Sequence, residues 1–172
     1  MKRVHIVGGK NHGKTGLVTD LIREFDGRGL RVGTIKYTHH QHELDTPGKD
    51  SHRHREAGAT VVGVMSRSLD AVFLPERGAL PAPQRYAGIT PMFEDCDLVV
   101  VEGDRLTDAA KIEVWRAAAG TRPLATDDPA ILAVVTDDPV DIQVPRLPRS
   151  DVSTVADWLL VLIAGIPEPR PQ

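Results

Sequence analysis

Apolar and polar positions divide the chain into short aliphatic runs and longer segments in which apolar residues recur with a helical period. The clearest aliphatic run is 97–101, and an uninterrupted run of this kind is typical of a strand buried on both faces. Apolar residues in 15–28 recur at helical spacing and glycines stand at the end, so we expect an amphipathic helix there. The other expected strands are 4–7, 30–35, 60–65, 69–74, 112–115 and 131–135, and the other expected helices are 84–93 and 152–164, the last capped by Ser150 or Asp151.

The order of these elements predicts an α/β fold. Strand, helix and strand follow one another at the start of the chain, which is the βαβ unit of parallel sheets. Residues 36–55 form a polar loop that runs into a short helix, and the strands 60–65 and 69–74 are close enough to pair as a hairpin. We expect one domain over residues 1–166, with a mostly parallel sheet flanked by helices, and a disordered tail at 167–172.

Composition narrows the function classes. The length of 172 residues fits one domain, and 41% apolar with 26% charged residues is the profile of a soluble globular protein. The formal net charge of −3 gives no electrostatic case for general nucleic-acid binding, so only a local basic patch could serve that purpose. Cys96 is the single cysteine and is expected to be a small packed residue. We find no secretory signal and no membrane-spanning run, and expect a cytoplasmic protein.

A phosphate-binding loop stands between the first expected strand and the first expected helix. It matches the pattern G-x-x-x-x-G-K-[ST], in which glycines allow backbone N–H groups to point inward and the helix start offers further unpaired N–H groups. Lys14 would reach the β- and γ-phosphates, and the Thr15 hydroxyl would bind Mg²⁺. The expected cradle comprises Gly8, Gly9, Lys10, Asn11, His12, Gly13, Lys14 and Thr15, of which His12 is expected to face solvent without a required role. The fold expected is therefore P-loop NTPase-like.

Acidic residues follow two of the expected strands. Glu102 ends the buried aliphatic strand, at the edge where parallel sheets bind ligands, and is our Walker-B-type Mg²⁺ ligand. Gly103 would let the backbone approach the γ-phosphate. The alternative is that Glu102 only ends a strand and faces solvent. Asp45, after the second strand, could be a second metal partner or position a water. Asp50 follows in the same loop and could equally cap a helix. Asp97 is expected to cap the turn before its strand.

Histidines cluster after the second strand, where five of the seven are found. Three interpretations stay open: a structural zinc site, a basic surface for a second anionic ligand or a partner, or a solvated polar loop. No cysteine stands nearby, whereas lysines and arginines are interleaved, which favours the basic surface over zinc. The five histidines are His39, His40, His42, His52 and His54, interleaved with Lys36, Lys49, Arg53 and Arg55.

The motifs, taken in order along the chain, resemble those of a known family. They are Gly8 to Thr15, Thr34-Ile35-Lys36, His39-His40, Asp45-Thr46-Pro47-Gly48-Lys49-Asp50-Ser51, Arg53-His54-Arg55, Ala57-Gly58-Ala59, Val101-Glu102-Gly103 and Lys111-Ile112-Glu113-Val114. This order resembles the MobB family, the GTP-binding adapter proteins of molybdopterin-guanine dinucleotide biosynthesis, over about residues 2–165. The Asp-x-Pro-Gly-Lys-Asp-Ser block is the specific part, because a Walker A motif alone occurs in many families.

The resemblance implies a homodimer that binds GTP and Mg²⁺ and is at most a weak GTPase. It implies work beside a MobA-type guanylyltransferase, which joins GMP to molybdopterin, and contact with molybdopterin or molybdoenzymes. By the same resemblance Lys14, Thr15, Asp45 and Glu102 fall on phosphate and metal positions, with Lys14 and Asp45 as the candidates for any catalysis. The departures from the family pattern are Gly16, Tyr37 and the pair Asp104-Arg105.

Guanine selection has no recognisable motif in this sequence. Asn11 is the only asparagine, so Asn-Lys-x-Asp is absent. Asp137, after the strand 131–135, could accept from guanine N1–H and the 2-amino group; the alternative is a turn aspartate before Pro139. Two other functions stay open: an ATP-dependent small-molecule kinase or ligase, and a scaffold that only binds the pterin product or a molybdoenzyme.

Overall fold

The computed structural model describes residues 1–38, 43–75 and 81–165, without the side chain of Ala82. The chain divides into two compact units: the first unit comprises Met1–Thr38 and Gly88–Gln172, and the second unit comprises His39–Ala87. The expected single domain stays a prediction, and the expected tail lies outside the described residues. None of the described helices combines the length and the apolar character needed to cross a membrane.

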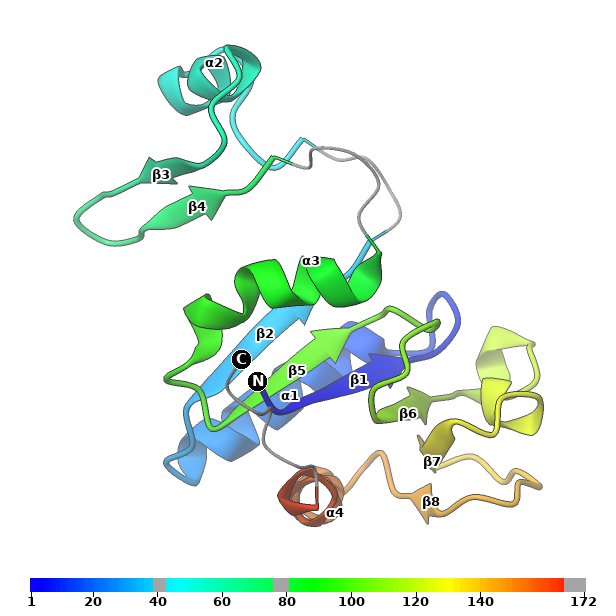
Figure 1. The fold of residues 1–172 in the computed structure, drawn as a ribbon. Helices are drawn as coiled ribbons and strands as arrows, with labels where there is room; N and C mark the ends of the chain where they lie inside the picture. Colours follow the sequence, from blue (N-terminus) through cyan, green and yellow to red (C-terminus); the bar gives the residue numbers. More distant parts are fainter. Residues whose placement is uncertain (39–42, 76–80, 166–172) are drawn as a thin grey trace. The chain divides into compact units, whose positions relative to one another are not determined.

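The first unit is built on a six-stranded sheet in which every pairing is parallel (Figure 1). The strand order is β2-β5-β1-β6-β7-β8. The bounds are β1 Arg3–Val7, β2 Val32–Lys36, β5 Leu98–Glu102, β6 Lys111–Val114, β7 Ile131–Val135 and β8 Arg146–Leu147. The strand that leads into the phosphate loop is therefore central, and the carboxyl ends of all its neighbours meet at the edge where that loop begins.

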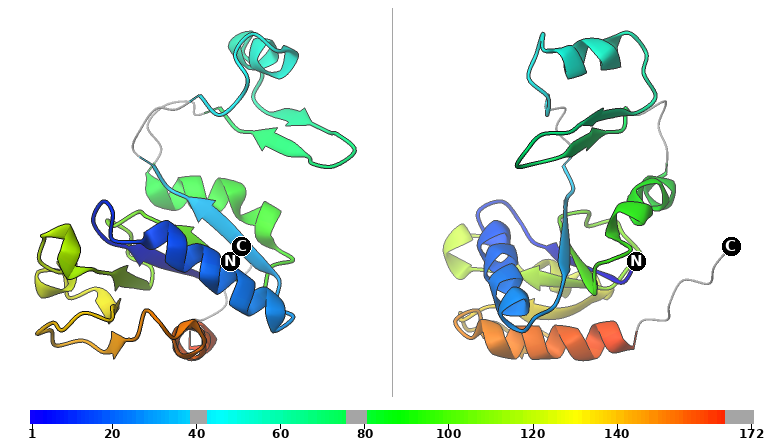
Figure 2. Two further views of the ribbon diagram at one scale, coloured as in Figure 1. Left: turned by 180° about the vertical axis from the view of Figure 1, so that it is seen from behind. Right: turned by 90° about the vertical axis from the view of Figure 1, so that its left-hand side faces the viewer.

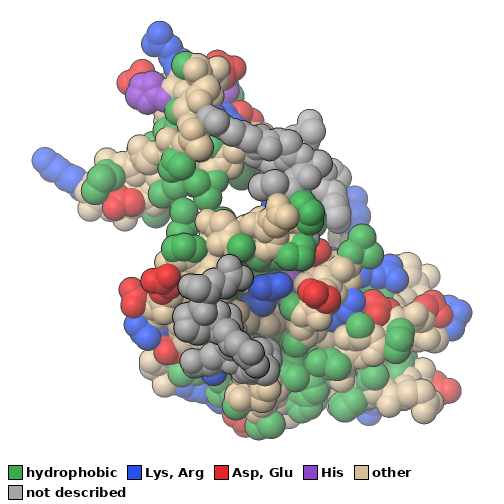
Figure 3. Space-filling view, in the orientation of Figure 1, with side chains coloured by type: hydrophobic (Ala, Val, Ile, Leu, Met, Phe, Trp, Pro, Cys, Tyr) green, Lys and Arg blue, Asp and Glu red, His purple; other side chains and the backbone are tan. Residues whose placement is uncertain are grey.

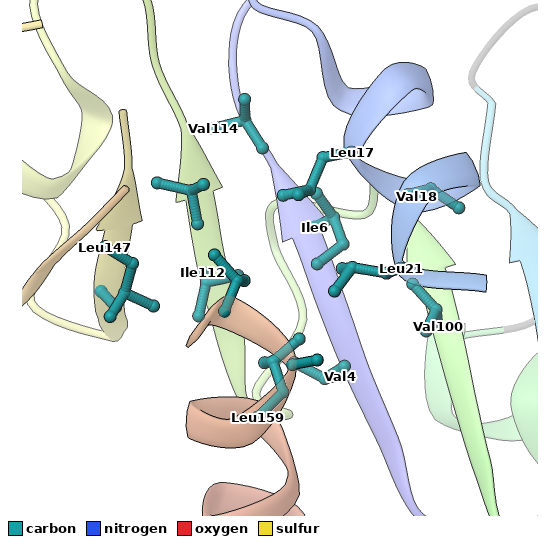
Figure 4. Packing of buried hydrophobic residues seen from close by; sticks show 14 of the residues in the cluster. Val4, Ile6, Leu17, Val18, Leu21, Val100, Ile112, Val114, Leu147 and Leu159 are labelled. Carbon is teal, nitrogen blue, oxygen red and sulfur yellow. The ribbon is translucent and has the colours of Figure 1, made fainter. Parts of the chain in front are cut away.

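One face of this sheet carries the hydrophobic core. Helices α1 (Lys14–Gly27) and α4 (Val152–Ala164) contact one another and cover this face (Figure 2). Alternate strand residues point to the same side, so Val4 and Ile6 meet Leu21 and Leu159 (Figure 4). Each fully buried aliphatic side chain of this kind contributes roughly 1.5–3 kcal/mol. Apart from Phe25, the buried side chains of this core are aliphatic.

The other face of the sheet buries charged groups with their partners. Lys111 pairs with Asp128 at 3.1 Å, and the carboxylate of Glu113 accepts from the backbone N–H groups of Leu124 and Ala125 at 2.8 and 2.9 Å. Burial raises the pKa of Glu113. These contacts hold the segment after β6 against the sheet. That segment contains the short 3₁₀ helices η2 (Ala117–Ala119) and η3 (Leu124–Thr126).

The second unit contains a short helix and a hairpin. Helix α2 is Asp50–Glu56, and β3 (Val62–Val64) pairs antiparallel with β4 (Ala71–Phe73), as the sequence predicts. Helix α3 (Ala82–Ile89) begins in the second unit and ends in the first, where η1 (Thr90–Phe93) continues the chain.

Three local details differ from the sequence-based expectations. The expected helix 84–93 changes to a 3₁₀ turn because Pro91, without an N–H group, cannot continue an α-helix. The segment 139–148, expected as a plain connection, contains β8. Asp97 does not cap the turn before its strand: its carboxylate accepts from the backbone N–H of Arg31 at 2.7 Å and from the guanidinium at 3.2 Å, joining β5 to the start of β2.

Candidate functional site

The phosphate loop leaves β1 in a conformation that only glycine adopts easily. Gly8 has a φ of +145°, and a Cβ there would collide with the carbonyl oxygen of Val114 on β6. Asn11 has a φ of +66°, and Gly13, with a φ of +93°, is the N-cap of α1. The start of α1 therefore presents its unpaired N–H groups to the inside of the loop, where an anion would be stabilised.

Lys14 folds back over this loop. Its Nζ donates to the carbonyl oxygens of Gly8 and Gly9 at 2.9 and 2.7 Å. Partial burial lowers the pKa of Lys14; Glu102 opposes that change, and the positive charge of Lys36 adds to it. Lys14 can therefore reach a phosphate held by the loop when it exchanges its contacts to these two carbonyl oxygens for contacts to the phosphate.

Glu102 lies beside the loop and not in solvent. It is 7% exposed, and its Oε1 accepts from the Thr15 hydroxyl at 2.8 Å and pairs with the ammonium group of Lys36. The alternative of a solvent-facing Glu102 is therefore wrong. A hydroxyl and a carboxylate oxygen in contact are the hard ligands that Mg²⁺ takes, so these two residues fit a magnesium ion. Their role as metal ligands stays a prediction.

Gly103 connects Glu102 closely to the end of β2. Its φ is +97°, and a Cβ there would lie 2.9 Å from the carbonyl oxygen of Tyr37. The N–H of Gly103 donates to Ile6 at 3.0 Å, and the N–H of Tyr37 donates to the carbonyl of Glu102 at 2.9 Å. The segment after β5 is thus fixed by backbone contacts to both neighbouring strands. Its expected approach to a γ-phosphate stays a prediction.

His12 does not face solvent as expected. It is 1% exposed, its Nε2 lies 2.9 Å from the Thr121 hydroxyl, and its Nδ1 accepts from the N–H of Arg116 at 3.1 Å. Burial lowers the pKa of His12, and the charges of Lys14 and Arg116 lower it further. The neutral ring ties the phosphate loop to the segment after β6. This contact could not be predicted from the sequence, because Thr121 and Arg116 are far from His12 along the chain.

The loops after β7 and β8 meet near the start of α1. Asp137 accepts from the N–H and the hydroxyl of Ser150 at 3.0 and 2.9 Å, and these bonds lower its pKa. Arg149 pairs with Asp20 at 2.6 Å and lies over Gly16. The expected reading of guanine by Asp137 stays a prediction, and the Ser150 contacts orient its carboxylate.

Comparison with known proteins identifies the family. The family described as "Molybdopterin guanine dinucleotide synthesis protein B", MobB, matches residues 3–137. The chain belongs to the MobB family. P-loop nucleotide binding fits the fold of this family.

Two relatives agree with this assignment, and a solved structure shares the fold. The "Molybdopterin-guanine dinucleotide biosynthesis adapter protein" of Escherichia coli is 35% identical over 149 residues, covering 86% of this chain and 85% of the relative. The protein with the same description in Haemophilus influenzae is 33% identical over 156 residues, covering 90% and 85%. The crystal structure of Bacillus subtilis MobB shares the fold, with a TM-score of 0.70, 21% identity and coverage of 96% and 100%. These matches do not favour the kinase or ligase alternative.

Asp45 belongs to the second unit of this MobB chain. Its Oδ1 accepts from the N–H of Thr46 at 2.8 Å and from the Ser51 hydroxyl at 2.9 Å. Its Oδ2 is buried without a hydrogen-bond partner among the described residues. Asp50 is the first residue of α2 and Lys49 is the N-cap, without a side-chain cap bond. The metal or catalytic role of Asp45 stays a prediction.

The histidine segment of this family member is described only in part. His39, His40 and His42 lie outside the described residues. His52 lies 3.4 Å from both Glu43 and Glu56, and Arg55 pairs with Glu43 at 2.6 Å. The Arg55 bond lowers the pKa of Glu43 to about 2. Within residues 1–38, 43–75 and 81–165, no group of three or more histidine, cysteine or acidic residues could hold a metal ion.

Two positively charged residues lie at the site although the sequence does not identify them as site residues. Lys36 contacts Glu102, and the Arg116 guanidinium lies so close to Gly13 that a Cβ there would come within 2.8 Å. Lys36 ends the strand beside that of Glu102, and this neighbourhood depends on the strand order, which the sequence does not state.

Proposed function

We propose that this chain is a GTP-binding adapter in molybdopterin-guanine dinucleotide biosynthesis, with weak or partner-dependent GTPase activity. The observation that carries the proposal is the contact of Thr15 with Glu102 beside an intact phosphate loop, in a chain of the MobB family. The relatives described as adapter proteins of this pathway support the pathway assignment.

The first unit would hold the nucleotide through its own groups. Backbone N–H groups of the loop and of the start of α1 would receive phosphate oxygens, and Lys14 would exchange the carbonyls of Gly8 and Gly9 for the β- and γ-phosphates. Thr15 and Glu102 would hold Mg²⁺, which neutralises phosphate charge when bound. Asp137 is our candidate for guanine recognition.

Asp45 is our candidate for a second metal partner or for positioning water. Its buried Oδ2, without a partner among the described residues, supports this role, because a buried carboxylate oxygen requires a donor or a cation. Ser51 and Thr46 hold the other oxygen and so orient the group.

We propose a MobA-type transferase as the partner, which the relatives described as adapter proteins of this pathway support. Molybdopterin or molybdoenzymes are the further partners that we propose, and we place the protein in the cytoplasm.

We propose also a homodimer, supported by exposed hydrophobic side chains on the hairpin of the second unit (Figure 3). These are Val61, Val64, Met65, Leu69, Val72 and Leu74, between 37% and 87% exposed. A two-stranded sheet of this kind is stable only with a further packing surface.

Lys14→Ala tests nucleotide binding in the phosphate loop. Loss of a charged phosphate contact should raise the Kd for GTP in the presence of Mg²⁺ by about tenfold or more, measured by isothermal titration. Arg23→Ala, on the exposed side of α1, is the matched control and should keep the wild-type Kd. Equal GTP binding by wild type and Lys14→Ala, or none by wild type, would contradict the proposal.

A further inference from the structure

Lys36 contacts the carboxylate that we propose as a metal ligand. It is the last residue of β2, and the parallel register places it directly beside Glu102, the last residue of β5. Its ammonium group pairs with Glu102 Oε1, the same oxygen that accepts from Thr15. The sheet register therefore fixes the two residues as neighbours.

Two ammonium groups, those of Lys14 and Lys36, lie near the carboxylate of Glu102. Lys14 and Lys36 lie close enough for Lys36 to lower the pKa of Lys14, and Glu102 is the carboxylate that faces both. A phosphate group in the loop would relieve this repulsion. An arrangement of two ammonium groups beside one carboxylate is therefore suited to receive an anion.

Lys36 can also move, whereas Glu102 is confined. The side chain of Lys36 is 59% exposed and that of Glu102 is 10% exposed. A divalent cation at Glu102 Oε1 would repel an ammonium group on the same oxygen, so Lys36 would have to leave. A flexible four-carbon side chain allows this movement, and the nearest new anion would be the terminal phosphate of the nucleotide.

We propose that Lys36 distinguishes a nucleoside triphosphate from a diphosphate. It pairs with Glu102 when no nucleotide is bound, and turns to the terminal phosphate when a triphosphate and Mg²⁺ are bound. This inference rests on the proposed function. It makes Lys36 a specificity residue, and Lys14 remains the contact common to both nucleotides.

Lys36 lies close along the chain to the start of the second unit. Tyr37 follows, held by its backbone to Glu102 and Gly103, and the second unit begins at His39. The residue that senses the terminal phosphate thus lies just before the junction of the two units. A change at Lys36 is therefore placed to affect the start of the second unit.

Lys36→Met tests the inference through nucleotide preference. Kd values for GDP and for a non-hydrolysable GTP analogue are measured by competition against a fluorescent nucleotide, with Mg²⁺ and with EDTA. With Mg²⁺ the variant should bind the analogue about tenfold more weakly, as expected for a lost charge-assisted contact, and GDP within about twofold of wild type. With EDTA the loss should shrink, because Lys36 then stays on Glu102.

Two controls make the result decisive. Lys36→Arg keeps the charge and should keep most of the triphosphate preference, and Arg23→Met removes a surface charge from α1 and should change neither Kd. Equal loss for both nucleotides, an unchanged ratio, or the same loss in EDTA would overturn the role of Lys36. Wild-type protein that binds neither nucleotide would instead overturn the proposed function and the inference with it.

Discussion

At the scale of single residues, the buried His5 makes the free energy of unfolding depend on pH. His5 lies fully buried on β1, with its Nδ1 3.3 Å from the Gly103 carbonyl and its Nε2 accepting from Arg3 at 3.2 Å. Burial lowers the pKa of His5 from 6.5 to about 4, against the effect of the Gly103 contact, and Arg3 lowers it further. The ring is therefore neutral in the folded protein at neutral pH.

We expect His5 to destabilise the fold as pH falls. Between pH 6.5 and about 4 the unfolded chain takes up a proton that the folded chain does not, so the free energy of unfolding decreases through this window. The loss between pH 7 and pH 5 should be about 2 kcal/mol from this group. Urea unfolding of wild type and His5→Gln at both pH values measures it. The variant should show a smaller decrease, and an equal decrease in both proteins would contradict this assignment.

Residues of the site differ in how far the sequence could predict them. Lys14 and Thr15 follow from a local motif, and Glu102 follows from a strand end, so their neighbourhood could be foreseen. The burial of His12 and the contact of Lys36 could not, because they depend on which strands lie side by side. Their partners Thr121 and Glu102 are distant in sequence.

At the scale of elements, helix α4 depends on its first residue. Asp151 is the N-cap: its side chain accepts from the N–H of Thr154 at 3.1 Å and from the Thr154 hydroxyl at 2.7 Å. The sequence left Ser150 and Asp151 open as caps. Ser150 instead donates to Asp137, so the structure selects Asp151.

Asp151→Ala should lower the free energy of unfolding by about 1 kcal/mol, the usual cost of a lost N-cap. Asp151→Asn keeps an oxygen for the Thr154 N–H and should cost only a fraction of this. Chemical unfolding followed by circular dichroism measures both variants. An Asp151→Ala midpoint equal to that of wild type would show that this cap does not stabilise α4.

The positions of the helices and strands along the chain were largely predictable, whereas the order of the strands in the sheet was not. A continuous aliphatic run located β5, which is buried along its whole length. Short runs rich in aliphatic residues located β1 and β7. Strand β8 was not predicted because its two residues are too few to show a periodic pattern. The sequence also could not state that β5 lies between β1 and β2, and this order brings Lys36 beside Glu102.

At the scale of the whole molecule, the two units differ in how they bury apolar surface. The first unit has its own core between the sheet and the helices α1 and α4. The described hairpin of the second unit leaves large apolar side chains exposed. We therefore propose that the contact of the proposed homodimer lies on that hairpin.

Val72→Glu tests this contact. Val72 is on β4 and 49% exposed, and a buried charge at the contact should shift the protein from dimer to monomer, measured by analytical ultracentrifugation. Val161→Glu is the matched control, because Val161 lies on α4 in the first unit and is 77% exposed. The control should remain dimeric. A dimeric Val72→Glu, or a monomeric wild type, would contradict this contact.

Nucleotide competition tests whether this chain is a GTP-binding adapter. GTP and ATP compete against a fluorescent guanine nucleotide on the full chain with Mg²⁺, with and without a MobA-type transferase, while phosphate release is followed. We expect preference for GTP over ATP, slow hydrolysis by the chain alone, and hydrolysis that is either unchanged or increased by the transferase. Tighter binding of ATP with rapid turnover on a small-molecule acceptor would contradict it.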